Sequence, residues 1–130
     1  MIHAGRIKDV KIKERNHILI LREEFAQARK ILRTRFRGLH FSSVQFCWLI
    51  KESTYGGWCW KQTRQIFLNR KYLDGRWKEE MMRMTLRHEL AHLVAEDRGH
   101  GRDFLWCLEQ LKGHRYVGAP VYEGRKPKKK

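Results

Sequence analysis

The sequence is short of cysteine, of acidic residues and of long hydrophobic runs. Its cysteines, Cys47, Cys59 and Cys107, include no pair at the close spacing of zinc ribbons and knuckles, which excludes a cysteine-based zinc site. They are expected to be reduced, with a disulfide between Cys47 and Cys59 as the alternative. The polar, basic start does not resemble a secretory leader, and the apolar run at 18–21 is too short to cross a bilayer. We therefore expect an intracellular, cytoplasmic protein with no membrane partner.

The shortage of acidic residues leaves a large positive charge. Twenty-nine lysines and arginines stand against fourteen aspartates and glutamates, so the formal net charge is +15 at pH 7. An excess of this size goes beyond what solubility needs and predicts a polyanionic partner, with nucleic acid as the first candidate. The alternative is that the basic side chains only solvate the surface.

The chain has the length and apolar content of one compact domain, and three stretches show the apolar spacing of helices. The first, about residues 17–37, predicts an amphipathic helix that has an arginine-rich outer face and ends at Gly38. A long helix is predicted over about 77–97 and a short closing helix over about 102–112. The basic end of the chain, 114–130, is expected to be a flexible tail.

Between the first two helices the pattern changes to that of strands. Strict alternation over 43–51 predicts a half-buried strand, and the glycine-containing turn at 55–58 predicts a hairpin to the next strand. Short strands around 58–60 and 66–68 would complete a small, mainly antiparallel sheet of about three strands. The tryptophans in this region are expected to fill the core rather than to stack on a ligand. The fold class is therefore α+β.

The chemistry of the chain is concentrated in the segment HELAHLVAEDRGHGRDF, residues 88–104. Four residues of helix turn the chain through about 400 degrees, so His88 and His92 project from nearly the same face and can bind one metal ion. Glu89 lies beside that face, where its carboxylate can reach a metal-bound water as a general base. The alternative is that both histidines are ordinary residues on a helix surface.

A catalytic zinc requires a third protein ligand and an open fourth position. His100 is the preferred third ligand because Gly99 and Gly101 on either side let the chain double back. The wide gap after His92 excludes the metzincin pattern, in which the third histidine follows more closely. Other groups within reach as the third ligand are His114, Glu96 and Asp97.

The segment also resembles a known family, the SprT-like zinc metallopeptidases. The resemblance rests on the HELAH core, on His100-Gly101 followed by an acidic residue and Phe104, and on the IFLN segment before the helix. It implies a zincin-like order of helix, small sheet, metal helix, His-Gly loop and closing helix. It also implies that His88, His92 and His100 bind Zn²⁺, that Glu89 is catalytic, and that proteins on DNA are the substrates.

Two departures from this family accompany the resemblance. The four-cysteine zinc ribbon that many members carry after this domain has no counterpart here, and Arg70 stands where a proline often follows the asparagine. Contact with DNA would then depend on the arginine-rich first helix, the aromatic residues of the sheet and the lysine-rich tail. The metallopeptidase domain is expected at 17–113, after a basic N-terminal segment at 1–16.

The expected function is zinc-dependent hydrolysis of a protein substrate. Zinc would lower the pKa of its water to about 7 and polarise the scissile carbonyl, while Glu89 takes the proton of the water. Two alternatives remain open, namely a zinc-dependent nuclease or other hydrolase, and a nucleic-acid-binding protein whose zinc is only structural. Glu89 beside an open metal position argues against the structural alternative, since structural sites are normally closed by protein ligands.

Overall fold

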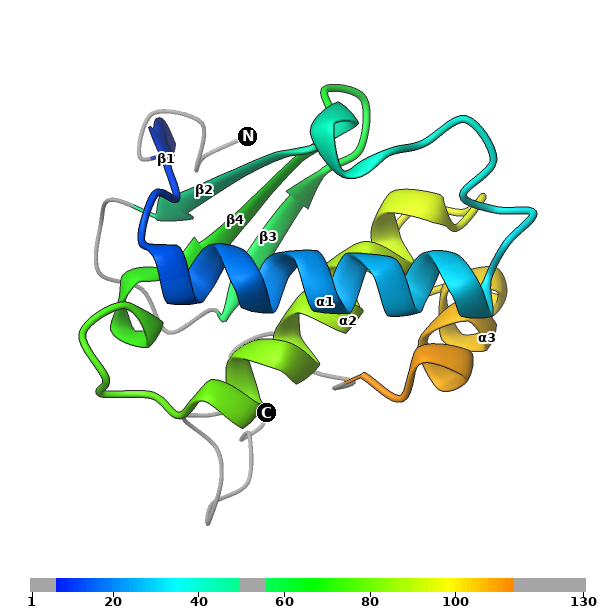
Figure 1. The fold of residues 1–130 in the computed structure, drawn as a ribbon. Coiled ribbons are helices and arrows are strands. Elements are labelled where there is room, and N and C mark those ends of the chain that lie inside the picture. Colours follow the sequence, from blue (N-terminus) through cyan, green and yellow to red (C-terminus); the bar gives the residue numbers. More distant parts are fainter. Residues whose placement is uncertain (1–6, 50–55, 114–130) are drawn as a thin grey trace, which may run out of the picture.

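The structure, a computed structural model, describes residues 7–49 and 56–113 and confirms the α+β class (Figure 1). Two short 3-10 turns, η2 (Phe41–Ser43) and η3 (Arg70–Tyr72), flank the sheet region. The strands and long helices follow one another as β1 (Ile7–Lys11), α1 (Arg15–Ile31), β2 (Gln45–Leu49), β3 (Gly57–Trp60), β4 (Gln65–Asn69), α2 (Glu79–Val94) and α3 (Arg102–Leu111). Within the described ranges, no helix has the length and apolar character needed to span a bilayer.

The four strands form one mixed sheet in the order β1-β2-β4-β3. The three strands expected from the sequence are present, and β1 adds a fourth that the sequence pattern did not predict. Two of the three pairings are antiparallel, β1 with β2 and β3 with β4, while β2 and β4 run parallel. The sheet is therefore mainly antiparallel, as expected.

The sequence predicts a hairpin between the strands that correspond to β2 and β3, and this prediction is wrong. β3 does not pair with β2 but turns back on β4, which it joins through the tight turn at 61–64. The physical reason lies in β4, whose Ile66 and Leu68 are fully buried and which gains backbone partners on both sides by taking the place between β2 and β3. A glycine-rich turn signal locates a reversal of the chain but does not specify which strands pair.

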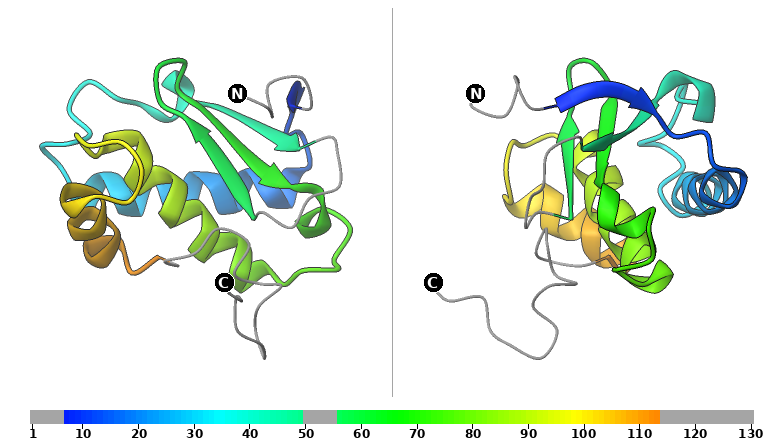
Figure 2. Two further views of the ribbon diagram at one scale, coloured as in Figure 1. Left: turned by 180° about the vertical axis from the view of Figure 1, so that it is seen from behind. Right: turned by 90° about the vertical axis from the view of Figure 1, so that its left-hand side faces the viewer.

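The helices pack on one face of the sheet, where the main core lies (Figure 2). Alternate residues of β2 and β4 point to this face, including Phe46, Trp48, Ile66 and Leu68. From the helix side, the buried residues Met82, Leu86 and Leu90 form a stripe along α2. α2 is therefore held between the sheet and α3, and its apolar stripe lies apart from the face that carries His88 and His92.

The opposite face of the sheet carries a second, small core of Cys47, Leu49 and Phe67. Trp58 and Trp60 pack against it and are each partly buried. Their placement agrees with the expectation that these tryptophans serve the core. All the cysteines are free thiols, so the alternative of a Cys47–Cys59 disulfide is not realised.

The helices are somewhat shorter than the apolar spacing predicts. α1 ends at Ile31, and the chain continues through turns to Gly38, where the backbone has a positive φ of 77°. Leu32 and Phe36 are nevertheless 4% and 0% exposed, so the apolar pattern continues in residues that are no longer helical. At its other end α2 begins with Glu79 and Glu80 in its first turn, where acidic side chains offset the positive end of the helix.

A cluster of ionic side chains joins α1 to α2. The carboxylate of Glu24, which is 5% exposed, accepts hydrogen bonds from Arg87 at 2.7 and 3.1 Å and from Arg83 at 3.0 Å. Arg83 also pairs with the exposed Glu23 and Glu79. Because Arg87 immediately precedes the first histidine of the motif, this cluster fixes α2 against α1.

Candidate metal centre

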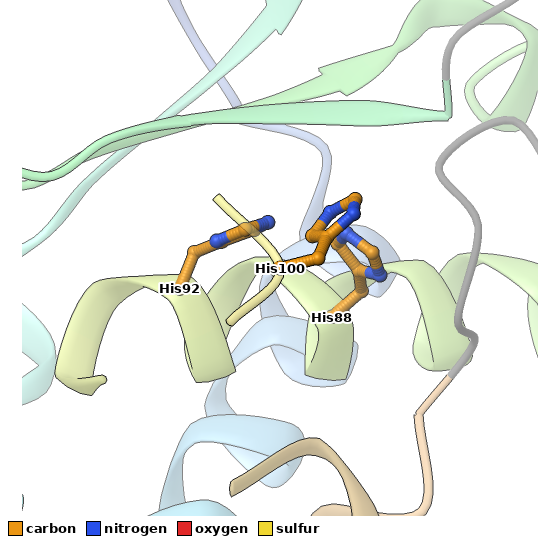
Figure 3. A group of neighbouring side chains, drawn as sticks. All are labelled: His88, His92 and His100. Carbon is orange, nitrogen blue, oxygen red and sulfur yellow. The ribbon is translucent and has the colours of Figure 1, made fainter. Parts of the chain in front are cut away.

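Three histidines lie together at one end of the core. His88 and His92 project from the same face of α2, and His100 approaches them from the loop that follows this helix (Figure 3). One ring nitrogen from each histidine can be chosen so that the three atoms lie within 4.8 Å of one another. The group is graded in exposure, because His88 is buried, His92 is partly buried and His100 is exposed. One side of the cluster is thus anchored in the core and the other faces the solvent.

Phe104 of α3 lies against all three imidazole rings. Its ring is stacked on His92 at 4.1 Å between centroids and on His100 at 4.8 Å, and it meets His88 edge-on at 5.0 Å. The side chain is fully buried. Phe104 therefore limits how the imidazoles can rotate and keeps water away from that side of the cluster. The sequence motif included this residue without indicating its place.

The protonation state of His92 also suits metal binding. Burial, together with the nearby charges of His88, His100 and Lys61, lowers the pKa of His92 to about 3. The imidazole of His92 is therefore neutral at ordinary pH and has a lone pair to donate. Three imidazoles that each offer one ring nitrogen are a donor set that zinc accepts readily, with room for a fourth ligand.

Glu89 follows His88 on α2 and is 1% exposed. Desolvation by burial raises the pKa of its carboxyl group well above the usual value. Its Oε2 atom makes no hydrogen bond within the described part of the chain. A buried acceptor in this state is costly unless a further polar group reaches it. The donor set and this carboxylate together fit a metal ion with a ligated water.

The backbone of β3 comes very close to Glu89. A Cβ atom placed on Gly57 would lie 3.1 Å from both Cγ and Oε2 of Glu89 and 2.9 Å from the carbonyl oxygen of Phe67. Gly57 has no positive φ, so its role is one of space rather than of backbone conformation. Because Gly57 has no side chain, the Glu89 carboxylate fits into the space beside β3. No local sequence signal identifies this contact, because the two residues are far apart in the chain.

The loop that carries His100 is fixed at its α3 end by two aspartates. Asp97 accepts hydrogen bonds from the backbone N–H groups of Asp103 and Phe104 at 2.8 and 3.1 Å, so it caps α3. Asp103 accepts a two-point hydrogen bond from Arg35 at 2.7 and 2.8 Å and another from the N–H of Glu96 at 2.7 Å. The Arg35 guanidinium lowers the pKa of Asp103 to about 2, so this carboxylate stays charged.

These contacts bear on the alternative third ligands. The Asp97 carboxylate is used by the cap of α3, and Glu96 is exposed outside the cluster of candidate ligands. His114 lies outside the described residues. His100 is thus the third member of the only potential metal-binding group among residues 7–49 and 56–113.

Comparison with known proteins agrees with the family suggested by the motif. Neither the curated proteins nor the solved structures include a significant match to this chain. The model of the SprT-like family matches residues 21–123, which include part of α1, the strands β2, β3 and β4, and the helices α2 and α3. Since this match covers well over half of the sequence, the chain belongs to the SprT-like family.

Proposed function

We propose that this protein is a zinc-dependent metallopeptidase in which His88, His92 and His100 bind the metal ion and Glu89 is the general base. The observation that carries the proposal is that one nitrogen from each of the three histidines lies within 4.8 Å of the others, while Glu89, next to His88 in the chain, is buried and is not one of the candidate ligands. A purely structural zinc would normally have four protein ligands, and a carboxylate held next to an incomplete set is typical of a hydrolytic site.

Zinc, when bound, supplies a Lewis acid that makes water nucleophilic near neutral pH and polarises a carbonyl group. The protein provides the proton transfer. Glu89 takes a proton from the attacking water at Oε2 and passes it to the leaving amine. Because burial raises the pKa of this carboxyl group, Glu89 accepts the proton more readily than an exposed glutamate would. Phe104 keeps the imidazoles in place during the reaction.

The position of β3 supports a polypeptide as substrate. The strand order places β3 at one edge of the sheet, and Gly57 at its start contacts Glu89 of the metal helix. An extended peptide can add to an edge strand through backbone hydrogen bonds, which would carry its scissile bond past Glu89. A phosphodiester backbone accepts hydrogen bonds but lacks the alternating N–H donors that strand pairing needs, so the arrangement favours a peptidase over a nuclease.

The charge of the chain supports the further proposal that the substrates are proteins associated with DNA. The net charge of +15 favours a polyanion, and the first helix contributes part of it on its outer side. Exposed basic residues of α1 and the turn after it are Arg15, Arg22, Arg29, Lys30, Arg33 and Arg37. DNA bound to this face would concentrate the enzyme on chromosomal or other DNA-bound proteins.

The test compares the wild type with Glu89→Gln and Glu80→Gln after loading with zinc. Glu80 lies exposed in the first turn of the same helix, so its variant removes one carboxylate at a distance from the site. We expect Glu89→Gln to keep one equivalent of zinc but to lose cleavage of a labelled protein substrate, with DNA present and absent. Glu80→Gln should retain both properties. Peptidase activity in Glu89→Gln would refute the role of Glu89, and cleavage of labelled DNA instead of protein would indicate a nuclease.

A further inference from the structure

We propose that Lys61 is a positioning residue of the metal centre, which holds the loop that presents His100 to the other two histidines. This inference rests on the proposed metal site and adds a residue that no sequence motif indicates. Lys61 does not act as a ligand, since its ammonium group is a cation. It acts on the backbone of the loop between α2 and α3.

The contacts of Lys61 connect the sheet to the end of the metal helix. Lys61 lies in the turn between β3 and β4, and its side chain reaches the C-terminal end of α2. Its Nζ donates a hydrogen bond to the carbonyl oxygen of Ala95 and another, at 3.2 Å, to that of Asp97. Ala95 is the C-cap of α2, where carbonyl groups have left the helical hydrogen-bond pattern and require other donors. A cation at this end also offsets the negative end of the helix dipole.

The loop needs such support because of its own composition. His100 stands between Gly99 and Gly101, and the backbone of Gly99 has a positive φ of 67°, a value that residues other than glycine rarely adopt. His100 is also exposed, so the core gives it little packing. Arg35 and Asp97 fix the loop where it enters α3. Lys61 fixes it where it leaves α2, and the two sets of contacts together leave His100 a short span between fixed points.

The geometry explains how a residue outside the ligand set can affect metal binding. Contacts that orient the metal ligands without binding the metal typically change metal affinity by about 10–100-fold when they are removed. Without the Lys61 ammonium, the carbonyls of Ala95 and Asp97 would turn toward water and the loop would gain conformations in which His100 is displaced. His88 and His92 are set by the helix and would remain in place.

The experiment measures zinc affinity by competition with a chromogenic chelator, for the wild type, Lys61→Met, Lys61→Arg and the matched control Lys13→Met. Lys13 is exposed in the link between β1 and α1, so its variant removes the same charge from the chain at a position outside the loop. We expect Lys61→Met to bind zinc about 10–100-fold more weakly and Lys13→Met to match the wild type. Lys61→Arg should recover part of the loss, because guanidinium can donate to the same carbonyls.

A double-mutant cycle separates this role from a general effect on the fold. In the His100→Ala background, the substitution Lys61→Met should change zinc affinity by less than about twofold, since the ligand through which Lys61 acts is gone. Circular dichroism of the metal-free proteins verifies folding, and if Lys61→Met does not fold, Lys61→Gln replaces it with the same expectations. An unchanged affinity in Lys61→Met, or an equal loss in both backgrounds, would overturn the inference alone. Failure of the wild type to bind zinc would overturn the proposed function as well.

Discussion

The contact between Gly57 and Glu89 predicts a large effect from one added methyl group. In Gly57→Ala, the new Cβ would lie 3.1 Å from Cγ and Oε2 of Glu89 and 2.9 Å from the carbonyl oxygen of Phe67. Carbon atoms in ordinary contact are separated by about 3.5–4.0 Å. The Phe67 oxygen belongs to the central strand β4 and has little freedom to move, so Glu89 must give way by several tenths of an ångström.

Two magnitudes follow from this overlap. Adding a methyl group to a packed site typically costs about 1–3 kcal/mol of stability. A misplacement of about 1 Å in a catalytic group can cost about 100-fold in rate, so a smaller shift of Glu89 should lower kcat/KM by about 10-fold or more. Zinc affinity should stay near that of the wild type, because the atoms nearest to the added group belong to Glu89 and Phe67 and not to the three histidines.

The assay combines urea unfolding, zinc stoichiometry and peptidase kinetics on Gly57→Ala and on the control Gly38→Ala. A Cβ at Gly38 would meet no atom within 4 Å, and the positive φ of 77° makes alanine cost about 1–2 kcal/mol there for backbone reasons alone. Both variants should therefore lose stability, but only Gly57→Ala should lose activity. Wild-type kcat/KM in folded Gly57→Ala, or an equal loss of activity in Gly38→Ala, would refute the reasoning.

Two further predictions concern stability. Glu24→Gln should lower the free energy of unfolding by about 1–3 kcal/mol in urea titrations, because it removes the negative charge with which Arg83 and Arg87 both pair. The control Glu23→Gln, which alters an exposed ion pair, should lower it by less than about 1 kcal/mol. Equal effects of the two substitutions would contradict the importance of the buried Glu24 carboxylate. Without metal, stability should fall as the pH drops from 7 to 5, because the unfolded chain binds a proton near pH 6.5 that folded His92, with its pKa lowered to about 3, does not accept. In EDTA, the wild type should lose about 2 kcal/mol more than His92→Gln over this interval, and parallel pH profiles would contradict it.

The parts of the site that lie close together in the sequence could be predicted. The spacing of His88 and His92 on a helix requires both rings to share a face, and the glycines around His100 permit the loop that brings it back. The helix over 79–94 and the closing helix at 102–111 follow from their apolar spacing, with only their ends displaced. Local geometry was sufficient for these features.

The parts that depend on distant contacts could not be predicted. Gly57 and Lys61 affect the site through residues more than thirty positions away, and nothing in their own neighbourhood signals a partner. The pairing of β2 with β4 had the same difficulty, because alternation identifies a strand without specifying its neighbour. β1 also depends on a distant contact, its pairing with β2, and the basic residues around it hide the apolar alternation by which a strand is recognised.

The pairing of β1 has a consequence for shortened versions of the protein. β1 covers one side of β2, and the N–H of Ile12 extends the contact by donating to the carbonyl oxygen of Phe46 at 3.2 Å. A chain that began at residue 21, where the family match starts, would keep every proposed ligand and Glu89. It would also turn β2 into a bare edge strand, and such edges recruit strands from other molecules. The same cut would thus retain the chemistry and promote aggregation, so poor yield of a trimmed protein would say nothing about its active site.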